Sequence, residues 1–156
     1  MYEIERKFLI RRPLAEVVAG AERSRIEQCY LPGTDEWAIR ARKRVSDSGT
    51  AFILTMKKRQ SDRTNVEIET AVAAEMYTQI EAVCGHDPLA KNRYVVGPWE
   101  IDEFLNPELQ GLIVAEIELK SENETFDIPA WLGEEVTGRF EYANASIARR
   151  LGVVAA

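Results

Sequence analysis

The chain has 156 residues, of which 46% are hydrophobic and 29% are charged, and these values are typical of a soluble globular protein. We therefore predict a single domain over residues 1–156, large enough to form a core without disulfides or a structural metal. The formal net charge of −6 argues against a partner such as nucleic acid, which is bound through a positive overall field. An anionic ligand would have to be attracted by locally placed charges or by metal ions.

Histidine and cysteine are too scarce to form several common kinds of site. His86 is the only histidine, which excludes a catalytic triad, and its Gly and Asp-Pro neighbours predict a loop. Cys29 and Cys84 lack metal-ligand spacing and form no disulfide framework, so we expect two reduced thiols. No apolar run approaches membrane-spanning length, and the charged start of the chain is unlike a signal peptide. A cytoplasmic protein without a membrane partner is expected.

Alternation of polar and apolar residues with a period of two predicts eight strands. They cover residues 2–10, 23–31, 37–44, 51–59, 65–72, 92–96, 99–104 and 112–119. Turn residues separate most of them, and the Ser-Asp-Ser-Gly sequence at 46–49 predicts a hairpin loop. Helical patterns cover residues 13–19, 73–83 and 141–151, and they end at Gly20, Gly85 and Gly152. The predicted fold class is α+β, rich in strand.

The polar faces of these strands carry pairs of like charge two residues apart. The pairs are Glu3 and Glu5, Arg40 and Arg42, Glu67 and Glu69, Lys91 and Arg93, and Glu116 and Glu118. Members of a pair lie about 7 Å apart on one strand face and repel each other modestly in water. A sheet with one packed and one solvated face explains any single strand. Pairs of both signs on so many strands favour a closed barrel that holds them inside, around a shared ligand.

The residue types inside such a barrel indicate the ligand. Paired carboxylates without histidine or thiolate favour a hard cation, Mg²⁺ or Mn²⁺. Lysine and arginine in the same lumen require anions that metal-bound carboxylates do not supply, and a polyphosphate satisfies both groups. Two metal ions could then act together, one holding the chain and one activating water. The sequence contains no glycine-rich phosphate loop, so side chains would have to recognise the phosphates.

The opening segment Glu3-Ile4-Glu5-Arg6-Lys7 resembles the Glu-x-Glu-x-Lys signature of the CYTH domain, the triphosphate tunnel metalloenzyme family. Further segments resemble later elements of this family in the same order. They cover residues 25–31, 39–42, 54–57, 91–94, 99–104 and 111–119, and then 134–138 followed by 142–144. The resemblance extends over nearly the whole chain. It implies a closed eight-stranded antiparallel β-barrel, or tunnel, with a polar charged lumen and helices packed outside.

The resemblance also implies roles for individual residues. The metal ligands would be Glu3, Glu5, Glu116 and Glu118, with Asp102 nearby. The phosphate-binding residues would be Lys7, Arg40, Arg42, Lys57, Arg63, Lys91 and Arg93. Five of these residues are expected to act in catalysis, namely Glu116, Glu118, Lys7, Arg40 and Arg42.

Several positions remain open within this resemblance. Arg63 and Glu67 match an Arg-x-Glu-x-Glu strand of the family only in part, because Asn65 stands where its first glutamate is expected. Glu67 is therefore either a site residue or a salt-bridge partner for the neighbouring arginines. Tyr30 has inward parity and is a possible site residue. We expect Arg6 and Arg44 to face outward.

The compact form of the chain resembles short bacterial members that hydrolyse tripolyphosphate to pyrophosphate and phosphate. The resemblance thus implies a metal-dependent triphosphatase with two Mg²⁺ or Mn²⁺ ions, acting on a small triphosphate as a monomer or homodimer. An adenylyl cyclase that makes cyclic AMP from ATP is the first alternative, and a thiamine triphosphatase is the second. A protein that senses polyphosphate or metal without turnover is the alternative outside enzymes.

Overall fold

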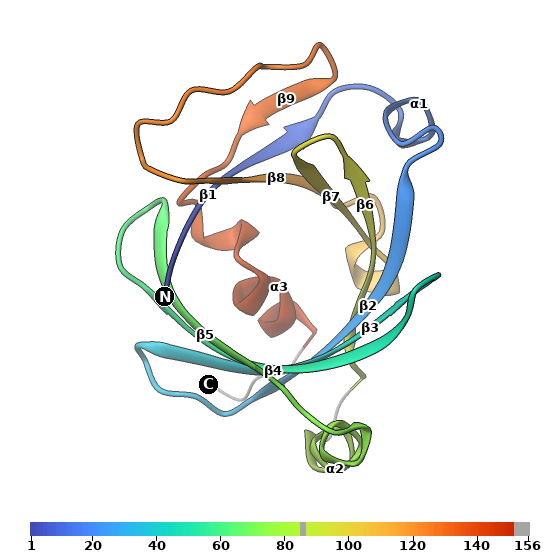
Figure 1. Cartoon of the computed structure of the whole chain (residues 1–156), viewed down its shortest axis with the longest axis vertical. Helices are drawn as coiled ribbons and strands as arrows, with labels where there is room; N and C mark the ends of the chain where they lie inside the picture. The colour runs from blue at the N-terminus through green and yellow to red at the C-terminus, as the bar shows by residue number, and fades with distance from the viewer. Residues whose placement is uncertain (85–86, 152–156) are drawn as a thin grey trace.

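One antiparallel sheet closes on itself to form a barrel in the computed structural model, which describes residues 1–84 and 87–151 (Figure 1). Its strands are β1 (Tyr2–Ile10), β2 (Glu22–Leu31), β3 (Trp37–Ser46), β4 (Gly49–Arg59), β5 (Thr64–Ala71), β6 (Leu89–Val96), β7 (Trp99–Phe104), β8 (Ile113–Leu119) and β9 (Leu132–Glu135). Their order is β5-β4-β3-β2-β6-β7-β8-β1-β9, and an additional pairing joins β5 to β1. The eight predicted strands are confirmed, and β9 is an addition.

Strand β1 closes the barrel because both of its edges are paired. One edge pairs with β8, from Ile4 opposite Leu119 to Phe8 opposite Ala115. The other edge pairs first with β5, where Tyr2 lies opposite Val66, and then with β9. The short β9 thus continues the edge that β5 leaves uncovered. The sheet consequently has no exposed edge along β1.

The outer wall of the barrel is covered on two sides. On one side, Trp99 and Ile117 pack with Val17 of α1 (Leu14–Val17) and with Phe126 and Trp131 of the segment that precedes β9. The Trp99 ring meets the rings of Phe126 and Trp131 edge to face, with centroids 5.6 and 5.5 Å away. These contacts bury the apolar residues that alternate with the charged ones along β7 and β8.

Helix α2 (Ala74–Cys84) covers the other side of the wall through Tyr77 and Ile80. Tyr77 packs on Cys29, which is buried, and neither Cys29 nor Cys84 forms a disulfide. Burial raises the pKa of the Cys29 thiol. It also raises the pKa of Cys84 to about 12, and the neighbouring Cys29 adds to this shift. The prediction of two reduced thiols is therefore consistent with their surroundings.

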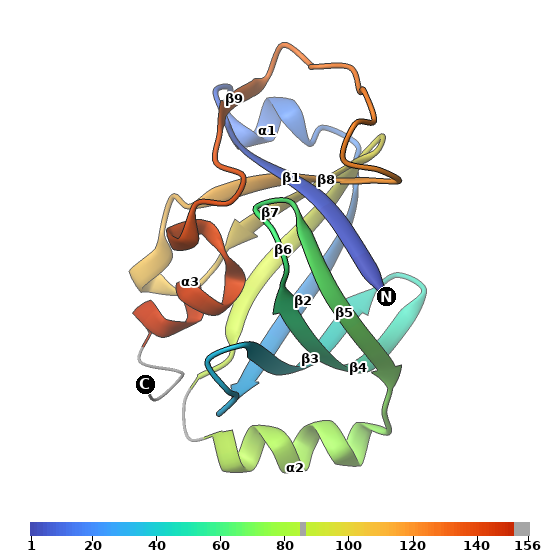
Figure 2. The same cartoon turned by 90° about the vertical axis from the view of Figure 1, so that its left-hand side faces the viewer.

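The third predicted helix is divided and lies at one end of the barrel rather than against its wall. A 3₁₀ turn (Phe140–Tyr142) precedes α3 (Asn144–Arg150). Ile147 and Ala148 of α3 pack on Tyr30, Leu89 and Phe104, whose side chains point into this end of the barrel. Figures 1 and 2 show α3 across the ring of strands and displaced to one side of it, away from the β3–β4 hairpin.

A further 3₁₀ turn (Pro107–Leu109) joins β7 to β8. The predicted loop at His86 and the predicted helix ends at Gly85 and Gly152 lie outside the described residues. Of the helices in the described ranges, none has the length and apolar character needed to cross a membrane.

The packing of the outer wall predicts a large effect of truncating Ile117, which is 3% exposed. Ile117→Ala should lower the free energy of unfolding by about 2–5 kcal/mol, because it removes buried methyl groups and leaves a cavity. Ile128→Ala is the matched control, because Ile128 is 73% exposed, and its effect should stay within about 0.5 kcal/mol. Urea denaturation measures both variants. If Ile117→Ala has as small an effect as Ile128→Ala, the outer face of β8 is not part of the core.

Candidate functional site

Charged side chains line the inside of the barrel beyond the apolar end that α3 covers. The cross-strand register places acids beside bases, with Lys7 opposite Glu116 and Lys57 opposite Glu67. Charged side chains of these strands enclose a cavity of about 330 Å³, which we call the central cavity, and Lys7 lines a second cavity beside it. The charged lining of the central cavity consists of Glu3, Glu5, Arg40, Arg42, Arg44, Lys57, Glu67, Glu69, Lys91, Arg93, Glu100, Glu116 and Glu118.

Lys7 links two of the glutamates that were predicted to bind metal. Its Nζ donates a hydrogen bond of 2.9 Å to Glu116 Oε1 and lies 3.3 Å from Glu5 Oε1. Burial alone would lower the pKa of Lys7, but Glu116 and Glu5 outweigh it and raise this pKa. Burial alone would likewise raise the pKa of Glu116, but Lys7 and Arg93 hold it well below its usual range. Both groups are therefore charged at neutral pH.

Lys57 makes the same kind of link on the neighbouring wall. Its Nζ contacts the Glu3 carboxylate and lies 3.5 Å from Glu5 Oε1 and 3.7 Å from Glu67 Oε2. Asn65 completes this group, since its Nδ2 lies 3.3 Å from Glu3 Oε2 and 3.4 Å from Glu5 Oε1 and donates to both. A glutamate at this position would add repulsion, whereas the amide supplies hydrogen-bond donors. Asn65 thus stabilises the two acids of the opening motif.

Asp102, which is predicted to lie near the metals, contacts two cations of the protein. Asp102 is about 1% exposed and is not among the residues that line the central cavity. Its Oδ2 accepts from Lys91 Nζ at 2.5 Å, and Arg93 donates to both carboxylate oxygens at 2.7 and 2.8 Å. Arg93 also contacts Glu100 and lies 3.6 Å from Glu116 Oε2. Asp102 is therefore a buried counter-ion for two predicted phosphate ligands.

Burial and neighbouring charges shift the pKa values of Lys91, Arg93 and Asp102 in opposing directions. Burial lowers the pKa of Lys91 to about 8, although the adjacent Asp102 opposes the shift. Burial alone would raise the pKa of Asp102, but Arg93 and Lys91 hold it below its usual value. Burial would also lower the pKa of Arg93, but Asp102 outweighs it and raises this pKa. Of the two cations, only Arg93 keeps a full charge over a wide pH range.

Three arginines of β3 form a row on the cavity wall. Arg40, Arg42 and Arg44 occupy alternate positions of the strand, and the Nε atom of each is buried without a hydrogen-bond partner in the described part of the chain. Arg40 lies 3.9 Å from Glu67, and Arg42 lies 3.4 Å from Glu69. The prediction that Arg44 faces outward is wrong, because Arg44 has the same parity as Arg40 and Arg42.

The remaining glutamates of the central cavity crowd one another. Burial raises the pKa of Glu118, and the negative charges of Glu3 and Glu100 add to this shift. Burial also raises the pKa of Glu67, and Glu3 again contributes. Glu67 Oε2 is buried and accepts no hydrogen bond from the described residues. Carboxylates that repel one another in this way fit a hard divalent cation, which would relieve the repulsion.

The carboxylate groups of the central cavity do not converge on one point. Within residues 1–84 and 87–151, no group of three or more His, Cys, Asp or Glu side chains is placed so that it could hold a metal ion. Lys7 and Lys57 stand between the glutamates instead. A bound cation would therefore have to compete with these ammonium groups for the same oxygens.

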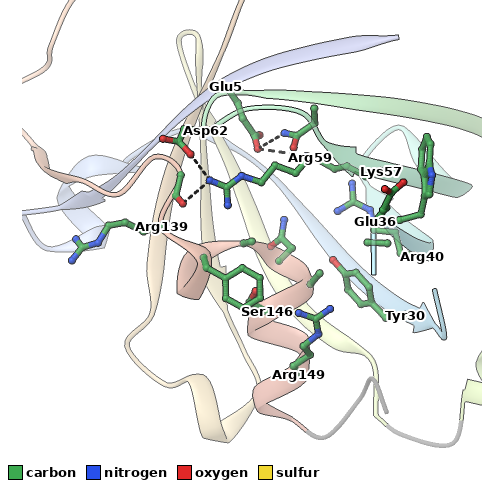
Figure 3. Close-up of a pocket in the computed structure, with 18 of the residues that line it drawn as sticks. Glu5, Tyr30, Glu36, Arg40, Lys57, Arg59, Asp62, Arg139, Ser146 and Arg149 are labelled. Atoms are coloured by element: carbon green, nitrogen blue, oxygen red, sulfur yellow. Dashed lines mark hydrogen bonds and ion pairs between the residues drawn. The ribbon is translucent and has the colours of Figure 1, made fainter. Parts of the chain in front are cut away.

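A second cavity, the end cavity, has a volume of about 190 Å³ and lies between the barrel and α3 (Figure 3). It shares Arg40 and Lys57 with the central cavity, so the two spaces adjoin. Tyr30 lines the end cavity, and Figure 3 shows it near Arg149 of α3. Burial alone would lower the pKa of Arg40, but the adjoining Tyr30 and Glu67 outweigh it and raise this pKa. Tyr30 thus acts on a residue of the central cavity from the neighbouring space.

Two hydrogen bonds of Arg59 close one side of the end cavity. Arg59 Nη2 donates to Asp62 Oδ1 at 2.5 Å and to the Gly138 carbonyl at 3.0 Å (Figure 3). Gly138 has φ of +75°, and a Cβ atom there would lie 2.8 Å from the Asp62 Cβ. Only glycine therefore lets the segment before α3 approach the β4–β5 hairpin this closely.

Two other arginines lie away from both cavities. Arg63 was predicted to bind phosphate, but it stands on the β4–β5 hairpin, and its Nη1 donates to the Glu122 carbonyl at 3.3 Å. Arg6 faces outward as predicted, with hydrogen bonds of 2.7 and 2.6 Å to Glu135. Its guanidinium also lies 4.9 Å from the centre of the Phe126 ring. Strand parity correctly predicts the outward direction of Arg6. It does not apply to Arg63, which lies in a hairpin beyond the end of a strand.

The reasoning from sequence missed three charged residues of the central cavity. Glu69 belongs to a like-charge pair, but it is not among the predicted site residues. Glu100 and Arg44 are not among them either. All three could have been found from parity, because each lies two residues from an inward-facing neighbour on the same strand.

Comparison with known proteins agrees with this architecture. The family model of the CYTH domain matches residues 1–151. The chain is 33% identical over 152 residues to an inorganic triphosphatase of Acetivibrio thermocellus, covering 94% of this chain and 93% of that protein. It is 31% identical over 157 residues to an inorganic triphosphatase of Nitrosomonas europaea, covering 95% of this chain and 97% of that protein.

Solved structures share the fold at lower identity. A putative adenylyl cyclase from Hippeastrum with a dominant triphosphatase activity matches with a TM-score of 0.55 at 14% identity, covering 76% of this chain and 80% of that one. A protein of Pyrococcus horikoshii matches with a TM-score of 0.54 at 20% identity, covering 97% of this chain and 90% of that one.

A closed antiparallel barrel whose lumen sets acids against bases defines a charged-tunnel protein. The match over residues 1–151 is more specific, and the chain belongs to the CYTH domain family. The resemblance that begins at Glu3, Glu5 and Lys7 is therefore confirmed.

The burial of Asp102 predicts a structural rather than a metal-binding role. Asp102→Asn should lower the free energy of unfolding by about 3–5 kcal/mol, because it leaves Lys91 and Arg93 buried with one counter-charge fewer. Asp127→Asn, at an exposed position, is the matched control and should change stability by no more than about 0.5 kcal/mol. Denaturant titration without added metal measures both. A loss below about 1 kcal/mol would mean that Asp102 does not hold the two cations.

Proposed function

We propose that the protein is a divalent-metal-dependent inorganic triphosphatase that hydrolyses tripolyphosphate to pyrophosphate and phosphate. One observation carries the proposal. The guanidinium groups of Arg40 and Arg42 share the central cavity with crowded glutamates, and their Nε atoms are buried without partners. A polyanion bridged to the glutamates by metal ions would satisfy both sets of groups. The names of the two relatives that align over nearly their whole length support this substrate.

The side chains divide into two groups in this proposal. Arg40, Arg42, Lys57 and Arg93 would bind phosphate oxygens, and Lys7 would join them when its glutamate partners turn to metal. Glu3, Glu5, Glu116 and Glu118 would hold two Mg²⁺ or Mn²⁺ ions, because their oxygens are the ligands that such hard ions prefer. The bound ions would supply charge neutralisation and a lowered pKa for the attacking water.

The residues of the cavity then carry the reaction. Attack of a water oxygen on a terminal phosphorus forms one P–O bond and breaks the bond to the bridging oxygen, so that pyrophosphate leaves. Arg40 and Arg42 would stabilise the negative charge that builds up on the transferred and leaving groups. Glu67 is a candidate to accept the proton of the water, because burial and Glu3 raise the pKa of its carboxyl group.

The alternatives differ in what is attached to the triphosphate. An adenylyl cyclase or a thiamine triphosphatase needs room for an organic group, and the end cavity offers such a space beside Tyr30, Trp37 and Phe140. A sensor would bind the same ligands without turnover. The preferred metal, the oligomeric state and the cytoplasmic location stay predictions from the sequence.

A parallel assay decides among these functions. Purified protein with Mg²⁺ or Mn²⁺ should release phosphate from tripolyphosphate with a kcat/KM at least about tenfold higher than from ATP or thiamine triphosphate. The reason is that only the phosphate chain is matched by charged groups. Cyclic AMP production from ATP would favour the cyclase instead. Binding without any turnover would favour the sensor.

Removal of one carboxylate tests the assignment of the metal ligands. Glu116→Gln should lower kcat for tripolyphosphate by at least about a hundredfold, because the neutral amide cannot replace a charged ligand for a hard cation. Glu108→Gln removes an exposed glutamate outside the barrel and should leave kcat within about twofold. Circular dichroism and thermal melting would verify that both variants are folded. A folded Glu116→Gln variant with normal turnover would remove Glu116 from the metal site.

A further inference from the structure

The row of arginines on β3 has a third member that the triphosphate site does not require. The pairing of β3 with β4 is regular from Trp37 opposite Lys58 to Ser46 opposite Gly49. Alternate side chains of a regular strand point to the same face. Arg44 therefore continues the row of Arg40 and Arg42 along the wall of the central cavity, which it lines.

The first two arginines of this row have carboxylate neighbours, and the third does not. Glu67 and Glu69 lie 3.9 and 3.4 Å from Arg40 and Arg42, respectively. No carboxylate of residues 1–84 or 87–151 forms an ion pair with Arg44, and its Nε is buried without a hydrogen-bond partner. A buried donor atom without a hydrogen-bond partner is costly, although the rest of the Arg44 side chain is partly exposed. Arg44 is thus the guanidinium of the row that has no ion-pair partner among the described residues and is free to bind an anion from outside the chain.

The position of Arg44 shows where that anion would lie. The four residues from Arg40 to Arg44 cover about 13 Å of extended strand. A phosphoanhydride repeat is shorter than one residue of such a strand, so a triphosphate, with two repeats, does not cover the whole row. Arg44 is close to the β3–β4 hairpin, which Figure 2 shows at the end of the barrel away from α3. A longer chain would extend towards that open end.

We propose that Arg44 binds phosphate groups beyond the third and that the tunnel prefers linear inorganic polyphosphates longer than tripolyphosphate. This inference rests on the proposed function, because it takes the first three phosphates to lie against Arg40 and Arg42. Arg44 would extend the site towards the β3–β4 hairpin, away from the end of the barrel where α3 packs.

The test compares two phosphate chains on three proteins. Linear pentaphosphate is used as a competitor of tripolyphosphate hydrolysis, and the ratio of its Ki to the KM of tripolyphosphate is measured. Arg44→Gln should raise this ratio by about tenfold, because a charge-assisted hydrogen bond to the additional phosphates is lost. Lys43→Gln removes a neighbouring charge on the opposite face of β3, where Lys43 lies 3.8 Å from Glu27, and should leave the ratio within about twofold. Arg44→Lys, which keeps the charge, should restore part of the preference.

Other results would overturn the inference. If Arg44→Gln is folded and the ratio is unchanged, Arg44 does not contact the additional phosphates. If Lys43→Gln raises the ratio as much as Arg44→Gln, the effect comes from the general field of the surface. A wild-type protein that does not hydrolyse tripolyphosphate would contradict the proposed function instead. In that case, calorimetric titration of wild type and Arg44→Gln with pentaphosphate still tests Arg44, and equal Kd values would contradict its role.

Discussion

The pairing of β1 with β5 is the constraint on which the rest of the structure depends. It turns a sheet with one charged face into a barrel with a charged interior, so that every inward side chain faces others across the lumen. Charges that would interact weakly in water interact much more strongly in this confined space. Lys7 and Lys57 accordingly bridge glutamates of different strands, and the apolar faces of the same strands are left to pack under α1, α2 and the segment before β9.

The cationic side chains inside the barrel differ in how fully carboxylates of the protein compensate their charge, and they form three groups. The buried Asp102 neutralises Lys91 and Arg93, so the charges of this group are compensated by the protein itself. Lys7 and Lys57 are shared among glutamates, so they can exchange partners when a cation and an anion enter together. The arginines of β3 have the weakest compensation, which increases the attraction of that wall for phosphate. In the proposed function, the ligand would be bound mainly by the groups whose charge the protein itself compensates least.

Period-two alternation was sufficient to predict the eight strands and the inward direction of Glu3, Glu5, Glu116 and Glu118, because parity along a strand is fixed by backbone geometry. The same alternation predicts an inward direction for Arg44, which has the parity of Arg40 and Arg42, so its outward assignment was an error of interpretation. The partners of Asp102 could not be predicted in this way, since they depend on the register between β6 and β7.

Other features lay beyond local pattern altogether. The four residues of β9 include a glycine and are too few to show alternation, so the strand is evident only from its pairing with β1. The site of α3 depends on apolar side chains such as Leu89 and Phe104, which come from distant strands. Arg63 lies in a hairpin, where no periodicity indicates the direction of a side chain. The sequence thus predicts faces and charges well, and the choice of partner poorly.

The raised pKa values of Cys29 and Cys84 have a practical consequence for spectroscopy. Thiolates rather than thiols react with maleimides and similar reagents, and neither native cysteine ionises readily near neutral pH. Cys29 is also buried beneath α2. A new cysteine at an exposed position could therefore carry a fluorophore or spin label without replacement of the native pair. Distances across the barrel could then be followed in solution on an otherwise unaltered chain.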